Sequence, residues 1–223
     1  MSQLLLDISP EHLPTLDNFV PGRNLELHSA LRHALSGSSS ERSFYLWGEP
    51  GSGKSHLLQA CARAAKQAGR SAVYVQGKVP EMADSLAEVV AVDDAERLDD
   101  AAQISLFDLY NRLRDSGGML LVSGTASPLH LKLRDDLRTR LGWGLVYQVH
   151  SLSDDEKAQA LVQYAQQKGF ALPPEVAQYL LRHGQRDLPS LTDTLDALDR
   201  HSLRLKRAPS VPLLKEVLQQ RGN

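Results

Sequence analysis

The sequence predicts an α/β fold, in which a parallel five-stranded sheet is followed by a small all-helical domain. Short apolar runs alternate with helical patterns as far as His150, a glycine-rich loop joins the first run to a helix, and only helical patterns follow. Strands that alternate with helices form a parallel sheet covered on both faces. We therefore expect a tail over residues 1–18, an α/β base over 19–150 and a helical lid over 151–223.

Composition limits the classes of protein to consider. The chain has 223 residues, of which 42% are hydrophobic and 23% charged, as in ordinary globular proteins. A net charge of −2 indicates no strong sequence-independent grip on nucleic acid, although a local basic patch could exist. The single cysteine, Cys61, excludes an intramolecular disulfide and suits a reducing compartment. Without a basic signal region or an apolar run of roughly 20 residues, we expect a soluble, cytoplasmic protein.

The elements of the base follow from local patterns. A helix is predicted after Pro21 and Gly22, another runs from Lys54 to about Gln67, and a third lies between the third and fourth strands. Buried strands are recognised as short runs of β-branched, aromatic and other apolar residues bounded by turn signals. The predicted strands are residues 44–47, 72–75, 89–92, 119–122 and 145–149.

The elements of the lid have clear start and stop signals. Ser153 and Glu156 form a capping box, which begins a helix that Gly169 ends. Further helices are predicted from Pro174 to Gly184, over about 187–201 and over about 211–220.

Residues 48–55 match the complete phosphate-loop pattern of a glycine, four residues, a second glycine, a lysine and a serine. Glycines let backbone N–H groups approach phosphate oxygens, and the following helix points its positive end at the same anion. Lys54 is predicted to bridge the β- and γ-phosphates, and Ser55 to bind magnesium. The alternative is a glycine-rich turn without a ligand. The predicted phosphate-site residues are Gly48, Gly51, Ser52, Gly53, Lys54, Ser55 and His56, with His56 near the phosphate but without chemistry of its own.

Two carboxylates follow the third predicted strand. Asp93 is predicted to hold Mg²⁺ through water, and Asp94 stands where many ATPases place a residue that polarises the attacking water. The alternative is a solvated acidic turn. Two arginines are also candidates: Arg140 ends a predicted helix and Arg186 begins one in the lid, although most arginines are surface residues in weak pairs.

Taken together, these motifs resemble the AAA+ family of the bacterial replication initiator DnaA, and most closely its shorter, Hda-type regulators. The resemblance covers nearly the whole chain. The segments that carry it are residues 18–22, 48–55, 92–94, 138–145 and 186–188 for the family, and 107–112 and 152–157 for the Hda type.

The resemblance implies roles for single residues. Val20 and Pro21 would line the adenine pocket, Arg140 would be an arginine finger offered to a neighbour's γ-phosphate, and Arg186 would contact phosphate from the lid. The role of Arg138 stays open. Thr125 stands where relatives usually carry a charged or amide side chain, which implies weak intrinsic hydrolysis.

The first residues resemble the peptide that docks into the DNA polymerase sliding clamp. Gln3 would hydrogen-bond at the edge of the pocket, and Leu4, Leu6 and Ile8 would bury apolar surface. The alternative is a tail that folds back on its own core.

The resemblance therefore implies a regulatory AAA+ adaptor that binds ADP or ATP with Mg²⁺. It would tether to the sliding clamp and stimulate ATP hydrolysis by DnaA, which prevents re-initiation. A short connection between the second and third strands and the absence of a C-terminal duplex-binding domain argue against an origin-binding initiator. DNA would be met only through the loaded clamp, no membrane is implied, and a homodimer is left open. The alternatives are an autonomous AAA+ ATPase, such as a loader or DNA-remodelling factor, and a pure binding scaffold.

Overall fold

The computed structural model describes residues 13–80, 86–185 and 187–221. The chain divides into two compact units. Of the described residues, the first unit contains 13–19, 26–47 and those between 54 and 147, and the second contains 20–25, 48–53 and those from 148 to 221. The phosphate-loop segment 48–53 thus groups with the C-terminal residues. The predicted boundary at residue 150 instead put this segment in the α/β base.

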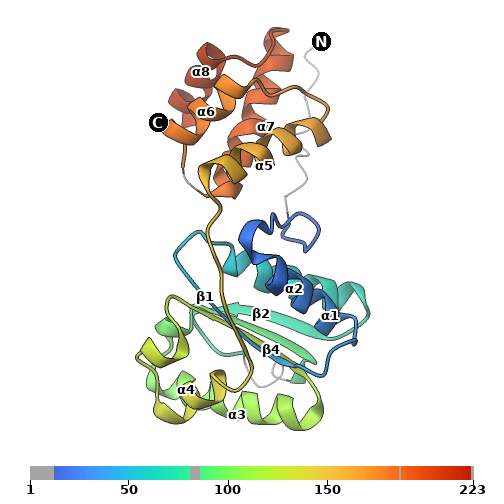
Figure 1. The fold of residues 1–223 in the computed structure, drawn as a ribbon, viewed down its shortest axis with the longest axis vertical. Helices are drawn as coiled ribbons and strands as arrows, with labels where there is room; N and C mark the ends of the chain where they lie inside the picture. Colours follow the sequence, from blue (N-terminus) through green and yellow to red (C-terminus); the bar gives the residue numbers. More distant parts are fainter. Residues whose placement is uncertain (1–12, 81–85, 186, 222–223) are drawn as a thin grey trace, which may run out of the picture. The chain divides into compact units, whose positions relative to one another are not determined.

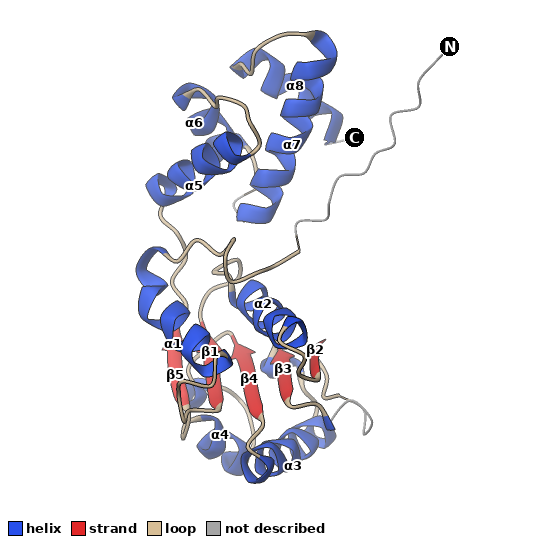
Figure 2. Ribbon diagram, turned by 90° about the vertical axis from the view of Figure 1, so that its right-hand side faces the viewer, coloured by secondary structure: helices blue, strands red, loops and turns tan. Residues whose placement is uncertain are grey.

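A five-stranded sheet forms the centre of the first unit, as predicted (Figure 2). The strand order is β2-β3-β4-β1-β5, and the pairs β2–β3, β3–β4 and β1–β4 are parallel. The expected and observed strand ends differ by at most two residues. The strands are β1 Ser43–Trp47, β2 Ala72–Gln76, β3 Val89–Asp93, β4 Met119–Gly124 and β5 Leu145–Gln148.

Helices cover both faces of this sheet, with α1 and α2 on one face and α3 and α4 on the other (Figure 1). Every residue of β3 and of β4 is buried, as expected for central strands of a doubly covered parallel sheet. The helices are α1 Leu25–Leu35, α2 Lys54–Gln67, α3 Asp100–Ser116 and α4 Asp135–Leu141. Short 3-10 turns occupy η1 Gly22–Asn24, η3 Ala95–Arg97 and η4 Pro128–His130.

Helix α3 shows how local sequence sets an element's ends. Asp99 caps its N-terminus by accepting a 2.8 Å hydrogen bond from the backbone N–H of Ala102. Gly117 ends it with φ +73°, a left-handed conformation that glycine adopts without strain. Between these ends, Leu106 and Leu109 are completely buried against the sheet, and truncating such a leucine to alanine costs about 2–5 kcal/mol.

Four helices make up most of the second unit: α5 Asp154–Gln167, α6 Pro174–His183, α7 Leu188–Leu205 and α8 Val211–Arg221. The capping box predicted at the start of α5 is present, with Ser153 and Glu156 bonding each other's backbone N–H groups. The helices enclose their own core, which includes Leu161, Leu180 and Leu195. Within the described ranges, no helix is long and apolar enough to cross a membrane.

Candidate functional site

The strand order brings together the carboxyl ends of three neighbouring strands, β1, β4 and β3. Strand β4 lies between β1 and β3, and Leu46 of β1 is in register with Ser123 of β4. The phosphate loop leaves the carboxyl end of β1, while Asp93 ends β3. Ligands of open parallel sheets bind at this carboxyl edge, which makes it the candidate site.

The phosphate loop has a backbone that other residues would not adopt. Gly51 and Gly53 have φ values of +77° and +103°, both in the region that favours glycine. A Cβ atom on Gly48 would lie only 2.4 Å from the carbonyl oxygen of Val149. The loop therefore needs glycine for conformation at two positions and for close approach at a third.

Ser52 identifies the loop as a cradle for a polar ligand. Its Oγ is buried, and among the described residues it has no hydrogen-bond partner. Buried hydroxyl groups in native proteins are almost always hydrogen-bonded, so an unsatisfied one points to a partner that binds there. The donors of a phosphate loop fit an anion with several acceptor oxygens, such as a nucleotide phosphate.

Lys54 supplies the positive charge beside this loop. It is the first residue of α2 and is buried except for 7% of its surface. Burial lowers its pKa, and the negative charges of Asp93, Glu96 and Asp94 oppose that change. A lysine held among carboxylates at the N-terminus of a 14-residue helix is well placed for an anion.

Asp93 is held by hydroxyl groups from two neighbouring strands. The carboxylate is completely buried; Ser123 donates to its Oδ1, and the Tyr74 hydroxyl donates to its Oδ2 across 2.8 Å. Burial and the nearby carboxylate raise the pKa of Tyr74 to about 12, so the phenol keeps its proton and remains a donor. The cost of burying this charge is thereby reduced.

Asp94 has a left-handed backbone conformation, and its carboxylate accepts hydrogen bonds from neighbouring side chains. Its φ of +57° is left-handed, a conformation in which aspartate is enriched among non-glycine residues. Its backbone N–H donates to Ser123 Oγ across 3.1 Å, and its Oδ2 accepts hydrogen bonds from Gln76 and Arg97. A single hydroxyl group, that of Ser123, thus holds both predicted acidic residues.

The sequence pattern indicated Thr125, just after strand β4, and did not indicate Ser123 on that strand. Thr125 is exposed just beyond the end of β4, whereas Ser123 is completely buried against Asp93. The sequence signal that could have indicated Ser123 is that it is the one hydroxyl residue in the apolar strand β4. Tyr74 was also missed, because nothing in its own strand indicates which neighbour its hydroxyl meets.

Val20 and Pro21, the predicted adenine-contacting residues, lie in a segment tied to the residues after β5. The Asn24 side chain donates to the His150 carbonyl oxygen across 2.8 Å and accepts from the His150 N–H across 2.7 Å. The Pro21 carbonyl oxygen accepts from the Asn24 N–H across 2.7 Å. Asn24 therefore fixes the position of this segment, a role that sequence reasoning did not detect.

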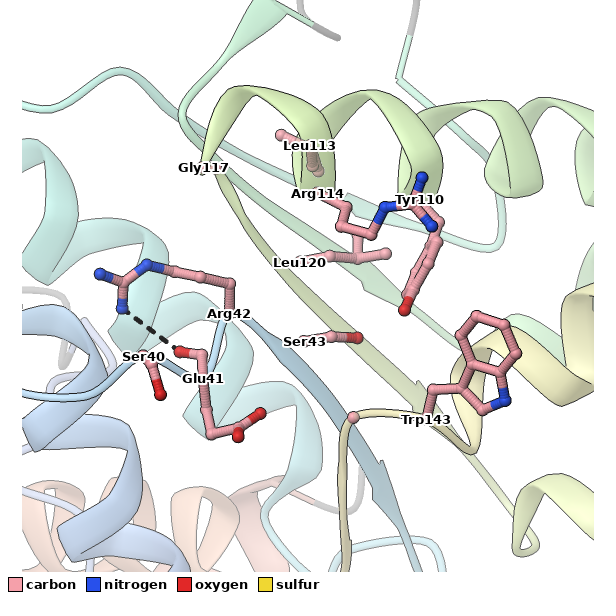
Figure 3. A pocket seen from close by; sticks show the side chains of 12 residues that line it. Ser40, Glu41, Arg42, Ser43, Tyr110, Leu113, Arg114, Gly117, Leu120 and Trp143 are labelled. Carbon is pink, nitrogen blue, oxygen red and sulfur yellow. Dashed lines mark hydrogen bonds between the residues drawn. The ribbon is translucent and has the colours of Figure 1, made fainter.

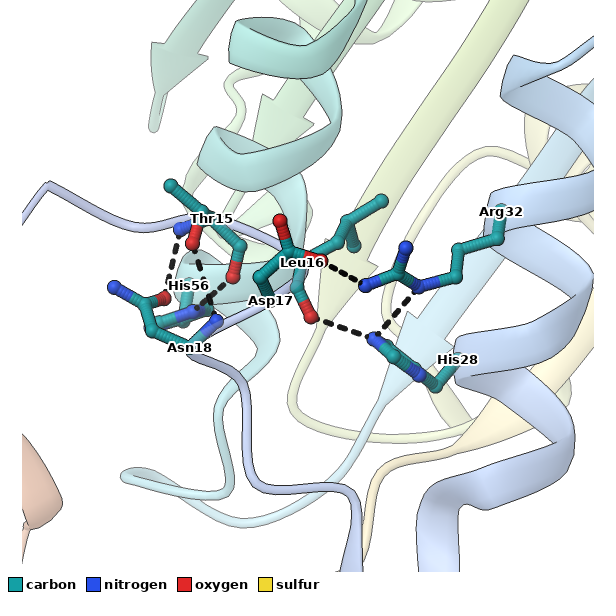
Figure 4. Close-up of polar contacts among 7 residues, drawn as sticks. All are labelled: Thr15, Leu16, Asp17, Asn18, His28, Arg32 and His56. Carbon is teal, nitrogen blue, oxygen red and sulfur yellow. Dashed lines mark hydrogen bonds and ion pairs between the residues drawn. The ribbon is translucent and has the colours of Figure 1, made fainter. Parts of the chain in front are cut away.

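His56 contacts a peptide segment that leads into the site (Figure 4). Its Nε2 lies 2.9 Å from the carbonyl oxygen of Thr15, and His28 Nε2 lies 2.7 Å from that of Leu16. A carbonyl oxygen only accepts, so His56 Nε2 is the donor of its bond. The ring of Phe19 packs between the two imidazoles, with centroids 5.8 and 5.6 Å away. The predicted phosphate neighbour His56 thus anchors residues 15–19.

Arg140 differs from the arginines around it. Arg138 pairs with Asp135 across 2.8 Å, and Arg134 pairs with Asp136 across 3.0 Å. The guanidinium carbon of Arg140 instead lies 4.0 Å from the ring centroid of Trp143 and 5.7 Å from that of Phe107. Over the ranges that the structure describes, no carboxylate pairs with Arg140.

Other predicted site residues lie outside the described residues. They are the lid arginine, Arg186, and the clamp-motif residues Gln3, Leu4, Leu6 and Ile8.

An α/β sheet of this order, carrying a phosphate loop and followed by a separate helical unit, defines an AAA+ protein. Residues 20–102 match the model of the AAA ATPase domain, and residues 154–218 match that of the Hda lid domain. Together these two matches support an Hda- and DnaA-related AAA+ family for this chain.

Solved structures share the fold. AMPPCP-bound DnaA from Aquifex aeolicus is 21% identical, with a TM-score of 0.72 over 83% of this chain; this chain spans only 65% of that protein's length. Domain III of DnaA from Thermotoga maritima is 21% identical, with a TM-score of 0.74 over 92% of this chain and 95% of that one. A RuvB variant from Thermotoga maritima is 18% identical, with a TM-score of 0.69 over 92% of this chain and 71% of that one.

Proposed function

We propose that the protein is a regulatory AAA+ adaptor, which binds an adenine nucleotide and stimulates ATP hydrolysis by DnaA in the cytoplasm. The Hda lid match and the phosphate loop support the class. The observation that carries the proposal is the environment of Arg140, whose guanidinium carbon lies over the Trp143 ring, 4.0 Å from its centroid, rather than against an acid.

The adaptor's own nucleotide would be ADP or ATP. Residues 48–55 would hold its phosphates and Val20 and Pro21 would contact its adenine, while the resemblance implies that Arg186, outside the described residues, would contact phosphate from the lid. Ser55 would be a direct ligand of Mg²⁺, with Asp93 acting through water, and bound magnesium would supply charge neutralisation at the phosphate oxygens. The orphaned Ser52 hydroxyl and the glycine conformations of the loop support this assignment.

Arg140 would act on the nucleotide of the partner. A guanidinium placed at a transferring γ-phosphoryl group neutralises charge that develops in the transition state, which is worth roughly 10³–10⁵ in rate. The N–H donors of Arg140 have no carboxylate in the described structure, whereas Arg138 and Arg134 each pair with an aspartate. This contrast favours Arg140 over Arg138 as the finger.

The clamp tether is proposed from the sequence alone. Gln3 would hydrogen-bond at the clamp pocket, and Leu4, Leu6 and Ile8 would insert as apolar anchors. The adaptor would then act only where the clamp is loaded on DNA, which restricts the reaction to replicating DNA.

The test is ATP hydrolysis by the cognate DnaA, with and without this protein, in the presence of DNA-loaded clamp. We expect stimulation that is lost in Arg140→Ala and retained in the matched control Arg138→Ala. The double variant Gln3→Ala/Leu6→Ala should lose clamp-dependent stimulation while binding ADP normally. Stimulation that survives Arg140→Ala would contradict the proposed finger.

The second candidate is an autonomous AAA+ ATPase. The proximity of Lys54 to the carboxylates of Asp93 and Asp94 favours it, because an adaptor does not need a complete hydrolytic set. Steady-state hydrolysis by the purified protein alone separates the two. Negligible turnover supports the adaptor, and brisk turnover without stimulation of DnaA supports the autonomous enzyme.

A further inference from the structure

The indole of Trp143 is an exposed aromatic surface directly beside the candidate arginine finger. We infer that Trp143 is a positioning residue, which holds the Arg140 guanidinium by stacking and leaves its N–H donors available to a partner's phosphate. This inference rests on the proposed function, in which Arg140 acts on a nucleotide bound to another AAA+ protein.

The distance between the two side chains fits a cation–π contact. The guanidinium carbon lies 4.0 Å from the indole centroid, well within the roughly 6 Å limit for a cation–π interaction. The backbone N–H of Trp143 also donates to the carbonyl oxygen of Arg140 across 3.1 Å. Side chain and backbone therefore hold the two residues together over three positions of the chain.

Stacking has a chemical advantage over an ion pair at this position. A guanidinium donates hydrogen bonds from its edge, in its own plane, and an aromatic ring occupies only its face. A carboxylate would use those same edge donors, as Asp135 does with Arg138 across 2.8 Å. Trp143 therefore restricts the long arginine side chain without consuming the groups that a phosphate would need.

The backbone next to Trp143 is closely packed, although 62% of the surface of Trp143 itself is exposed. The next residue, Gly144, runs so close to β1 that a Cβ atom on it would lie 2.3 Å from the carbonyl oxygen of Ser43. Trp143 lines a cavity of about 440 Å³, together with Tyr110 and Arg114 (Figure 3). The backbone that carries Trp143 thus packs directly against strand β1.

The experiment compares Trp143→Phe, which keeps an aromatic face, with Trp143→Leu, which removes it. DnaA-bound ATP hydrolysis is followed at increasing adaptor concentration with DNA-loaded clamp, to obtain the maximal rate and the half-saturating concentration. We expect Trp143→Leu to lower the maximal rate by about two- to fivefold, the range of an exposed cation–π contact, with little change in half-saturation. Trp143→Phe should retain most of the rate.

Controls separate positioning from other roles. Leu129→Ala removes another exposed apolar side chain, 80% accessible, and should leave the maximal rate unchanged. In an Arg140→Ala background, Trp143→Leu should have no further effect. A Trp143→Leu variant that keeps the full maximal rate, changes only half-saturation, or still lowers the residual rate without Arg140 would overturn the inference.

A partner-free measurement distinguishes failure of this inference from failure of the proposed function. In a Trp47→Phe background, Trp143 is the only tryptophan left. Arg140→Ala should then change its fluorescence intensity and its accessibility to acrylamide, and an unchanged signal would overturn the contact itself. If the signal changes but Arg140→Ala leaves DnaA stimulation intact, the proposed finger is wrong while the stacking stands.

Discussion

The hydroxyl group of Tyr74 donates a 2.8 Å hydrogen bond to Oδ2 of Asp93, a carboxylate with no exposed surface. Together with Ser123, it places a hydroxyl donor on each oxygen of the candidate metal carboxylate. A buried charge in this position is stable only while such donors surround it. The same hydrogen bond therefore stabilises the carboxyl end of β3 and positions the carboxylate that is proposed to hold magnesium.

Replacing Tyr74 by phenylalanine removes this donor without changing the ring. We expect the free energy of unfolding to fall by about 1.5–3 kcal/mol, the usual worth of a hydrogen bond to a charged group. Urea denaturation of the variant and of the unsubstituted protein measures this change in the free energy of unfolding. Tyr147→Phe is the matched control, because its hydroxyl lies 3.5 Å from the exposed Glu26 and should contribute little. Equal effects of the two substitutions would contradict the importance of the Asp93 contact.

Ser123 and Thr125 offer a comparison of two hydroxyl residues on one strand end. Ser123→Ala removes the partner of Asp93 and of the Asp94 N–H, so a loss of about 1–3 kcal/mol of stability is expected. Thr125→Ala changes an exposed side chain and should stay within about 0.5 kcal/mol. Thermal or urea unfolding of both variants decides whether Ser123 is the structural residue of the pair.

Gly48→Ala tests the close approach in the phosphate loop. The added Cβ would lie 2.4 Å from the Val149 carbonyl oxygen, so the backbone must move. We expect at least a tenfold loss of ADP affinity, measured with a fluorescent nucleotide. Gly37→Ala is the control: it also has a positive φ, of +80°, but its Cβ would meet nothing within 4 Å. That variant should lose some stability and keep its ADP affinity.

His56 predicts a pH dependence of stability. Burial lowers its pKa below the ordinary value of 6.5, and its bond to the Thr15 carbonyl opposes this only in part. The unfolded chain therefore takes up a proton at a higher pH than the folded chain does. The stabilising contribution is complete above about pH 6.5 and is lost as pH falls from there through the folded pKa.

His56→Gln should therefore reduce the fall in the free energy of unfolding between pH 7 and pH 5.5. Glutamine keeps an N–H donor for Thr15 but does not titrate in this range. His33→Gln, the same substitution at an exposed histidine, is the control for the change of residue type. Identical pH profiles for the His56 variant and the unsubstituted protein would show that His56 is not responsible.

Much of the fold could be predicted because its signals are local. The five strands are short apolar runs between turn residues, and the capping box of α5 involves only Ser153 and Glu156. The partners of Asp93 could not be predicted in the same way. Tyr74 lies 19 residues before it and Ser123 lies 30 residues after it, so only the β2-β3-β4 order makes them neighbours.

The sequence by itself determined the class of ligand, because a phosphate loop binds through consecutive backbone groups that one short segment supplies. Residue chemistry alone did not separate Arg138 from Arg140, which are two residues apart on one short helix, and only the resemblance to the DnaA-related family implied that Arg140 is the finger. The tertiary structure shows that their surroundings differ, with Arg138 against Asp135 and Arg140 against the rings of Trp143 and Phe107, and this difference supports the proposed role of Arg140. An arginine's availability depends on which groups surround its guanidinium in space, and the Phe107 ring comes from α3, more than thirty positions earlier in the chain.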